Sequence, residues 1–184
     1  MIKVPLKWSV EHETILRNLF LNITQNNLDR KDNADKLKKI ETTLLDFSIK
    51  LNTKYKKLED IDLDKHKELA NRQMLKVKNW ASKQFDYIET TKDTDITKKI
   101  NNNAKFRARD FKGTYYSTFL NEIVSEDSEY FQWETMGDNR VRDEHMDREL
   151  EIYKFEDADL LPGEDPGCRC WASAYFPDEW EMPN

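Results

Sequence analysis

Residues 130–145 read YFQWETMGDNRVRDEH, and they mark the point where the pattern of the chain changes from helical to strand-forming. The segment begins with residue types that are enriched in strands, namely Tyr130, Phe131, Trp133 and Thr135. It then reaches Gly137-Asp138, a pair that typically forms a turn. A second strand candidate, Trp171–Phe176, follows two Pro-Gly turns. We expect these two strands to pair in a small antiparallel sheet.

Upstream of this segment the chain is nearly free of residues that break helices. Gly113 is the first glycine, and Pro5 is the only proline before Pro162. Apolar residues recur at helical spacing. This pattern predicts four helices: from an N-cap at Ser9 through Ile23, over 34–55, over 65–90, and from a cap at Thr94 or Asp95 to Val124. A break is expected from Asn26 to Asp35, and β-structure is expected only after Ser125.

The predicted fold class is therefore α+β, with long N-terminal helices followed by a small antiparallel sheet with irregular loops. The apolar stripes of the helices indicate core or helix–helix contacts rather than a cofactor site. Amphipathic helices of this kind either pack as a bundle or project as long arms that dock on a partner. The sequence leaves both arrangements open.

The composition indicates a folded protein with large solvated surfaces. Charged residues make up 36% of the chain and the mean hydropathy is −0.92, yet 11% of the residues are aromatic, unlike a disordered chain. Residues 1–124 contain 25 basic and 18 acidic residues, a net charge of +7, whereas 125–184 contain 5 and 18, a net of −13. The basic half could approach DNA phosphates. Its lysines are interleaved with acidic residues, so a solvated helix surface is the favoured interpretation.

Cysteine usage and hydropathy indicate where the protein is made. Cys168 and Cys170 are the only cysteines, and a single residue between them is poorly suited to a disulfide. Proteins of reducing compartments typically lack disulfides. The N-terminus lacks the apolar core of a signal peptide, and no stretch approaches the roughly 20 apolar residues of a membrane span. We expect a protein made in the cytoplasm, with no membrane-spanning segment.

Two clusters in the C-terminal third carry a family resemblance. The first contains Trp133, Thr135, Asp138, Arg140, Arg142 and His145, and the second contains Pro162, Gly163, Cys168, Arg169 and Cys170. In order and spacing they resemble the signature of the phage Mu F-like head-morphogenesis family: a W-x-T strand, D-x-R-V-R-x-x-H, and P-G-x-x-x-x-C-R-C before a last strand. Upstream, Ala108-Arg109-Asp110 resembles the A-R-T/D-E segment of that family. Family members usually carry a glycine a few residues after the histidine, where this chain has Asp147–Glu151.

The resemblance implies a structural minor capsid protein of the phage head, not an enzyme. Members of this family associate with the portal and the capsid interior and aid head assembly, DNA packaging or ejection. The implied partners are the portal protein and the major capsid protein, with packaged DNA as a further one. The implied location is the virion head, after synthesis in the bacterial host cytoplasm. The resemblance divides the chain into a helical docking region, 1–92, and a Mu F-like head-morphogenesis domain, 93–184.

Two other function classes remain as alternatives. One is a phage-encoded effector or metal-binding domain related to the Mu F-like modules of polymorphic toxins. About eight residues follow the last strand candidate in this sequence, so we expect no C-terminal toxin domain. The other is an enzyme, but the sequence contains no nucleophile elbow, P-loop or paired-histidine metal motif.

The polar residues of the motif admit two interpretations. The favoured one is a buried cluster of Asp138, Arg140 or Arg142, and His145 that holds the loop 143–167 against the sheet. Such a cluster should be well connected, because half-satisfied buried networks are costly. In this interpretation the protein needs no cofactor.

The second interpretation is a metal site. His145, Cys168 and Cys170 would supply three ligands, with Asp138 or Asp143 as the fourth. Zinc accepts sulfur, nitrogen and oxygen donors in a tetrahedral arrangement. Arg169 lies between the cysteines, so an extended chain places it on the opposite side from both sulfurs.

Overall fold

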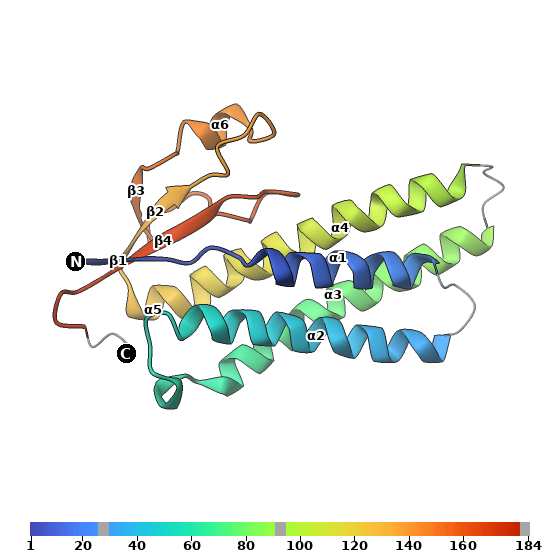
Figure 1. Cartoon of the computed structure of the whole chain (residues 1–184), viewed down its shortest axis with the longest axis horizontal. Coiled ribbons are helices and arrows are strands. Elements are labelled where there is room, and N and C mark those ends of the chain that lie inside the picture. Colours follow the sequence, from blue (N-terminus) through green and yellow to red (C-terminus); the bar gives the residue numbers. More distant parts are fainter. Residues whose placement is uncertain (26–29, 91–94, 181–184) are drawn as a thin grey trace.

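The computed structural model describes residues 1–25, 30–90 and 95–180, and it shows a helical bundle with a small sheet at one end (Figure 1). Four long helices form the bundle: α1 (Val10–Gln25), α2 (Arg30–Asn52), α3 (Leu63–Thr90) and α4 (Ile96–Phe119). A 3-10 turn, η1 (Leu58–Asp60), lies between α2 and α3. The π-helical turn η2 (Leu120–Val124) and the short α5 (Ser125–Asp127) extend α4 toward the sheet.

The sheet has four strands, and every pair is antiparallel. They are β1 (Ile2–Pro5), β2 (Tyr130–Glu134), β3 (Ile152–Lys154) and β4 (Trp171–Phe176), in the order β1-β4-β2-β3. The antiparallel pairing of β2 with β4 confirms the expectation that these two strands pair in a small sheet. The short helix α6 (Asp143–Met146) lies between β2 and β3.

Strand β1 corrects the expectation that β-structure follows only after Ser125. Its residue Ile2 pairs with Phe176, at the far end of the chain. The strand lies at the edge of the sheet, where a proline such as Pro5 is tolerated. A four-residue edge strand with so distant a partner leaves no local periodicity to detect.

The helix boundaries agree with the sequence pattern except at α2. The Ser9 N-cap is confirmed, because its Oγ accepts a hydrogen bond from the backbone N–H of His12 at 3.2 Å. Helix α2 begins at Arg30, inside the expected break from Asn26 to Asp35. Lysine, arginine and alanine favour helix, and the run from Arg30 to Asp35 contains all three. Residues 26–29, where the break is still expected, lie outside the described residues.

The helices pack as a bundle, which settles the choice between bundle and projecting arms. Their apolar stripes and the inner face of the sheet form one continuous core. The ring of Tyr55, just after α2, stacks on Phe176 of β4 at 4.5 Å. The hydroxyl of Tyr116 in α4 donates to the carbonyl of Leu6 at 2.8 Å and accepts from the N–H of Ala172 at 2.9 Å. The sheet is therefore anchored to the bundle.

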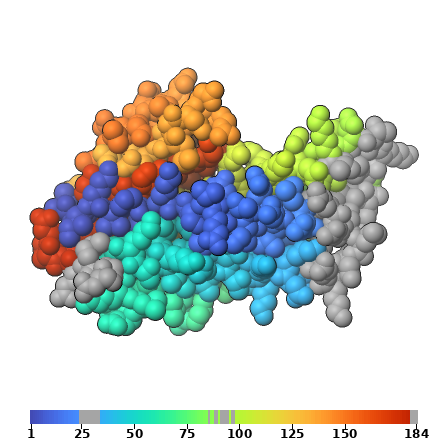
Figure 2. Space-filling view, viewed as in Figure 1, coloured from blue at the N-terminus to red at the C-terminus, as the bar shows by residue number. Residues whose placement is uncertain are grey.

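The space-filling view shows the C-terminal unit, residues 128–176, standing over one end of the bundle (Figure 2). The expected boundary between residues 92 and 93 falls at 91–94, outside the described residues, and it stays a prediction. Within the described ranges, none of the helices has the length and apolar character that crossing a bilayer requires.

Candidate functional site

The turn after β2 positions the motif residues. The hydroxyl of Thr135 accepts a hydrogen bond from the N–H of Gly137 at 3.1 Å, and the N–H of Thr135 donates to Glu149 Oε2 at 2.6 Å. Gly137 adopts a left-handed conformation, with φ of 63°, which glycine reaches at low cost. The chain then enters α6, which carries the buried side chain of His145.

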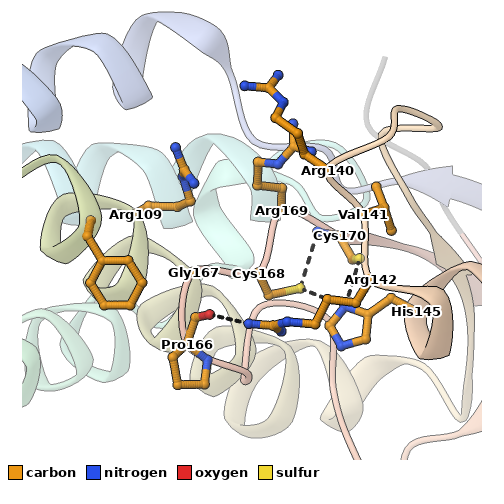
Figure 3. Close-up of a pocket in the computed structure, with 11 residues that line it drawn as sticks. Arg109, Arg140, Val141, Arg142, His145, Pro166, Gly167, Cys168, Arg169 and Cys170 are labelled. Carbon is orange, nitrogen blue, oxygen red and sulfur yellow. Dashed lines mark hydrogen bonds between the residues drawn. The ribbon is translucent and has the colours of Figure 1, made fainter. Parts of the chain in front are cut away.

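His145 lies in a polar network, and Figure 3 shows its ring near Arg142, Cys168 and Cys170. Its Nε2 is 2.9 Å from Asp165 Oδ2, and its ring meets the ring of Trp133 edge-on, with centroids 5.4 Å apart. Arg142 donates to the same carboxylate at 3.3 Å and to the carbonyl of Pro166 at 2.7 Å. These contacts hold α6 against the loop that precedes β4.

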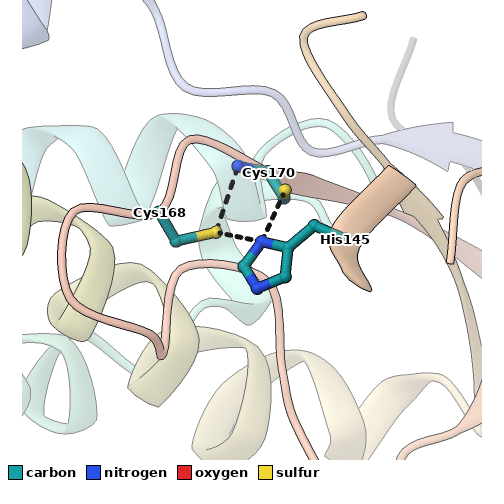
Figure 4. A group of neighbouring side chains, drawn as sticks. All are labelled: His145, Cys168 and Cys170. Carbon is teal, nitrogen blue, oxygen red and sulfur yellow. Dashed lines mark hydrogen bonds between the residues drawn. The ribbon is translucent and has the colours of Figure 1, made fainter. Parts of the chain in front are cut away.

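Both sulfurs face the other nitrogen of the same imidazole (Figure 4). Cys168 Sγ lies 3.5 Å and Cys170 Sγ 3.4 Å from His145 Nδ1. The N–H of Cys170 also donates to Cys168 Sγ at 3.3 Å. The hydrogen bond from Cys170 lowers the pKa of Cys168, and the same pairing raises the pKa of Cys170.

Asp138 belongs to a second network. Arg169 donates two hydrogen bonds to its carboxylate, one of them at 2.9 Å. Arg140 adds a side-chain bond at 3.1 Å and a backbone bond at 3.0 Å. The hydrogen bonds from Arg169 hold the pKa of Asp138 well below its ordinary value. Arg169 thus points away from the two sulfurs, as its place between them predicts.

The prediction of a single cluster of Asp138, an arginine and His145 is therefore wrong, because Asp138 and His145 belong to two different networks. The Asp138 side chain is 34% exposed and pairs with Arg169 and Arg140, while His145 is buried and pairs with Asp165. The alternation of side chains around Arg169 separates the two networks. Sequence reasoning missed Asp165, whose only signal was its place between the two Pro-Gly turns.

Pro162 and Gly163 serve packing. Gly163 has a φ of 91°, and its backbone lies directly against Gly113 in α4. A Cβ on Gly113 would lie 2.5 Å from the Gly163 carbonyl oxygen, and a Cβ on Gly163 would lie 2.7 Å from that of Gly113. Only two glycines allow the loop to approach the helix so closely. The Pro-Gly turn therefore places the segment with both cysteines against the bundle.

A cavity of about 220 Å³ adjoins the sulfurs and His145 (Figure 3). Four arginines line it: Arg109, Arg140, Arg142 and Arg169. Arg109, from the Ala-Arg-Asp segment, projects into the region from α4, whereas Asp110 pairs with Arg107 at 3.1 Å. The site thus combines buried soft donors with a positively charged opening.

Asp143, the other expected fourth ligand, lies exposed at the start of α6 and does not join the group of donors around His145 within the described residues. Asp138 is engaged by two arginines. The structure therefore brings together three of the expected metal ligands, His145, Cys168 and Cys170, and neither of the two expected carboxylates.

Comparison with known proteins adds one family. A family model described as Phage Mu protein F like protein matches residues 48–173. The match runs from within α2 into β4, so it includes α3, α4 and every motif residue discussed above. Searches of curated proteins and of solved structures gave no match.

Proposed function

This chain belongs to the phage Mu protein F-like family, a family of phage head proteins, and we propose that it is a minor head protein bound at the portal vertex, on the inner side of the capsid. There it would aid head assembly, DNA packaging or ejection as a structural component. The portal protein and the major capsid protein are the proposed partners, and the virion head is the proposed location.

The observation that carries this proposal is the extent of the family match. Residues 48–173 include α3, α4 and the end of α2, together with the C-terminal unit as far as Ser173. The two parts also share one core. We therefore assign the head role to the helical bundle and the C-terminal unit together. The bundle presents a broad helical surface, and the C-terminal unit is compact and acidic.

We assign docking to the outer surface of the bundle. The apolar stripes of the helices are buried in the core, so they are not available to a partner. The outer face of α3 instead presents Leu75, Lys76 and Lys83 to solvent. With a net charge of +7 over residues 1–124, this surface fits an acidic face of a portal or capsid subunit.

A structural role agrees with the geometry around His145. Asp165 engages its Nε2 and the two cysteines face its Nδ1. A general base needs a nitrogen that can reach a substrate proton. Both ring nitrogens here have partners within the protein, which favours a binding and structural role over catalysis.

The test is incorporation into heads assembled with the portal and major capsid proteins. We expect the wild-type chain to co-purify with heads and with isolated portal. The double variant Lys76→Glu, Lys83→Glu should be incorporated several-fold less, while the matched Lys76→Arg, Lys83→Arg variant should behave as wild type. Absence of the wild-type chain from heads would overturn the head role. Normal incorporation of the folded charge-reversed variant would overturn docking through α3.

A further inference from the structure

The three donor atoms around His145 have the spacing of a metal site. His145 Nδ1, Cys168 Sγ and Cys170 Sγ all lie within 4.8 Å of one another, and all three side chains are buried. A tetrahedral zinc ion, about 2.3 Å from sulfur and about 2.0 Å from nitrogen, holds such donors about 3.5 Å apart. The sulfur–nitrogen distances of 3.5 and 3.4 Å match this separation.

Hydrogen bonding alone does not account for the arrangement. The carboxylate of Asp165 accepts from Nε2 of His145, so in the neutral imidazole the ring proton is on Nε2 and Nδ1 is an acceptor. The single lone pair on Nδ1 then faces two sulfur atoms, although it can accept only one well-directed hydrogen bond. A cation between the three atoms would satisfy all of them at once.

The surroundings resemble those of metal-bound histidines. Such a histidine almost always donates its second ring N–H to a carboxylate, a carbonyl or water, which fixes the tautomer. Asp165 fills this role, and Arg142 orients Asp165 in turn. The backbone N–H of Cys170 donates to the sulfur of Cys168, as expected for a bound thiolate. Two thiolates and a neutral imidazole would balance the charge of one divalent ion.

We propose that His145, Cys168 and Cys170 bind one zinc ion, with a water molecule from the adjoining cavity as the fourth ligand. The cavity of about 220 Å³ is lined by all three ligands, so a water can reach the ion. The ion would link α6 to the segment before β4 and close the intervening loop. This proposal does not depend on docking at the portal.

The test is metal binding by the full-length chain, stripped of metal with a chelator and kept reduced. We expect one Zn²⁺ per chain in competition with a chromophoric chelator. Co²⁺ should give the visible bands of a tetrahedral ion and a thiolate charge-transfer band. Cys168→Ser, Cys170→Ser and His145→Gln should each weaken binding by about 100-fold or more. Asp165→Asn should weaken it by about 10- to 100-fold.

The matched control is His66→Gln, which replaces another buried histidine outside the site and should bind Zn²⁺ as wild type does. The proposal would be overturned if the wild-type protein showed no thiolate-to-cobalt charge-transfer band, or if it did not bind one Zn²⁺ per chain. Undiminished binding in both serine variants would also overturn it. Because the cobalt spectrum is measured on the wild-type chain, the test holds even if a variant fails to fold.

Discussion

At the scale of single residues, one backbone conformation departs from its ordinary range. Among the described residues, Leu150 is the only non-glycine residue with a positive φ, 66°. It closes the turn after α6, where its N–H donates to the carbonyl of Trp133 at 2.8 Å. Members of the family usually carry a glycine in this region. The turn in this chain is thus left-handed at a residue whose side chain makes that conformation costly.

Replacing Leu150 by glycine should therefore stabilise the protein. The left-handed conformation costs a non-glycine residue about 1–2 kcal/mol, and part of this gain is offset by the greater freedom of glycine in the unfolded chain. The Leu150 side chain is 58% exposed, so little burial is lost. We expect a net gain of about 0.5–1 kcal/mol in urea unfolding. Leu150→Ala, which keeps the Cβ, should show no gain, and an equal gain in both variants would contradict the argument.

Gly113 presents the opposite case, because helix propensity and packing disagree. In an exposed helix, Gly→Ala stabilises by roughly 1 kcal/mol. Here the new Cβ would lie 2.5 Å from the carbonyl oxygen of Gly163. We expect Gly113→Ala to destabilise the protein by about 1–3 kcal/mol, as other overpacked sites do.

The measurement for Gly113→Ala is the midpoint of urea unfolding, with Gly137→Ala as comparison. A Cβ on Gly137 meets nothing within 4 Å, so only its positive φ penalises the substitution. Stabilisation by Gly113→Ala would show that the loop at Gly163 moves aside freely.

At the scale of elements, a buried polar network joins three helices. His66 of α3 lies 2.8 Å from Ser48 Oγ and 2.9 Å from Asn52 Nδ2, both in α2. The hydroxyl of Tyr115 in α4 donates to the same serine at 2.8 Å. The amide of Asn52 donates to Nε2, so the imidazole must stay neutral to accept this bond. Burial lowers the pKa of His66 to about 4.

This network predicts a loss of stability in mild acid. The unfolded chain binds a proton at His66 near pH 6.5, whereas the folded chain does so only near pH 4. Stability from this residue is therefore complete above about pH 6.5 and declines as the pH falls toward 4. The decline amounts to about 2–3 kcal/mol.

The check is the difference in unfolding free energy between wild type and His66→Gln. Glutamine still offers an acceptor for Asn52 but does not titrate. Other groups that titrate in this range contribute equally to both proteins. The advantage of the wild type should shrink between pH 7 and pH 4.5, and a constant difference would place the pKa of His66 elsewhere.

At the scale of the whole molecule, the bundle and the sheet depend on each other. Buried side chains from all four long helices and from the sheet form one cluster. Polar links reinforce it, since Lys56 pairs with Asp127 at 3.0 Å and Trp180 donates to the carbonyl of Tyr55 at 2.6 Å. A shared core favours a single cooperative unfolding transition.

We therefore expect two signals to be lost at the same urea concentration. One is the helical signal in circular dichroism, and the other is the fluorescence of buried Trp133. The remaining tryptophans are replaced by phenylalanine so that the fluorescence reports on the C-terminal unit. Removing one link with Lys56→Met should lower both midpoints together. Two separate midpoints would instead support the boundary between residues 92 and 93 as a division between independent domains.

The helices and two of the strands could be predicted from the sequence, because they depend on residues that are close together in the chain. The helical spacing of apolar residues from Ser9 to Val124, the strand composition of β2 and β4, and the alternation around Arg169 all depend on neighbours a few residues apart. The motif of Trp133, His145 and the two cysteines also predicted the family, which the match over residues 48–173 confirms.

Only the tertiary structure decided the contacts between distant segments. Edge strand β1 exists because β4 offers it a partner more than 160 residues away, and Gly113 matters because Gly163 lies against it. The pairing of Asp138 with Arg169 and of His145 with Asp165 likewise depends on how a long loop folds back. The spacing of apolar residues predicts which face of a helix or strand is buried, but it does not predict which distant segment packs against that face.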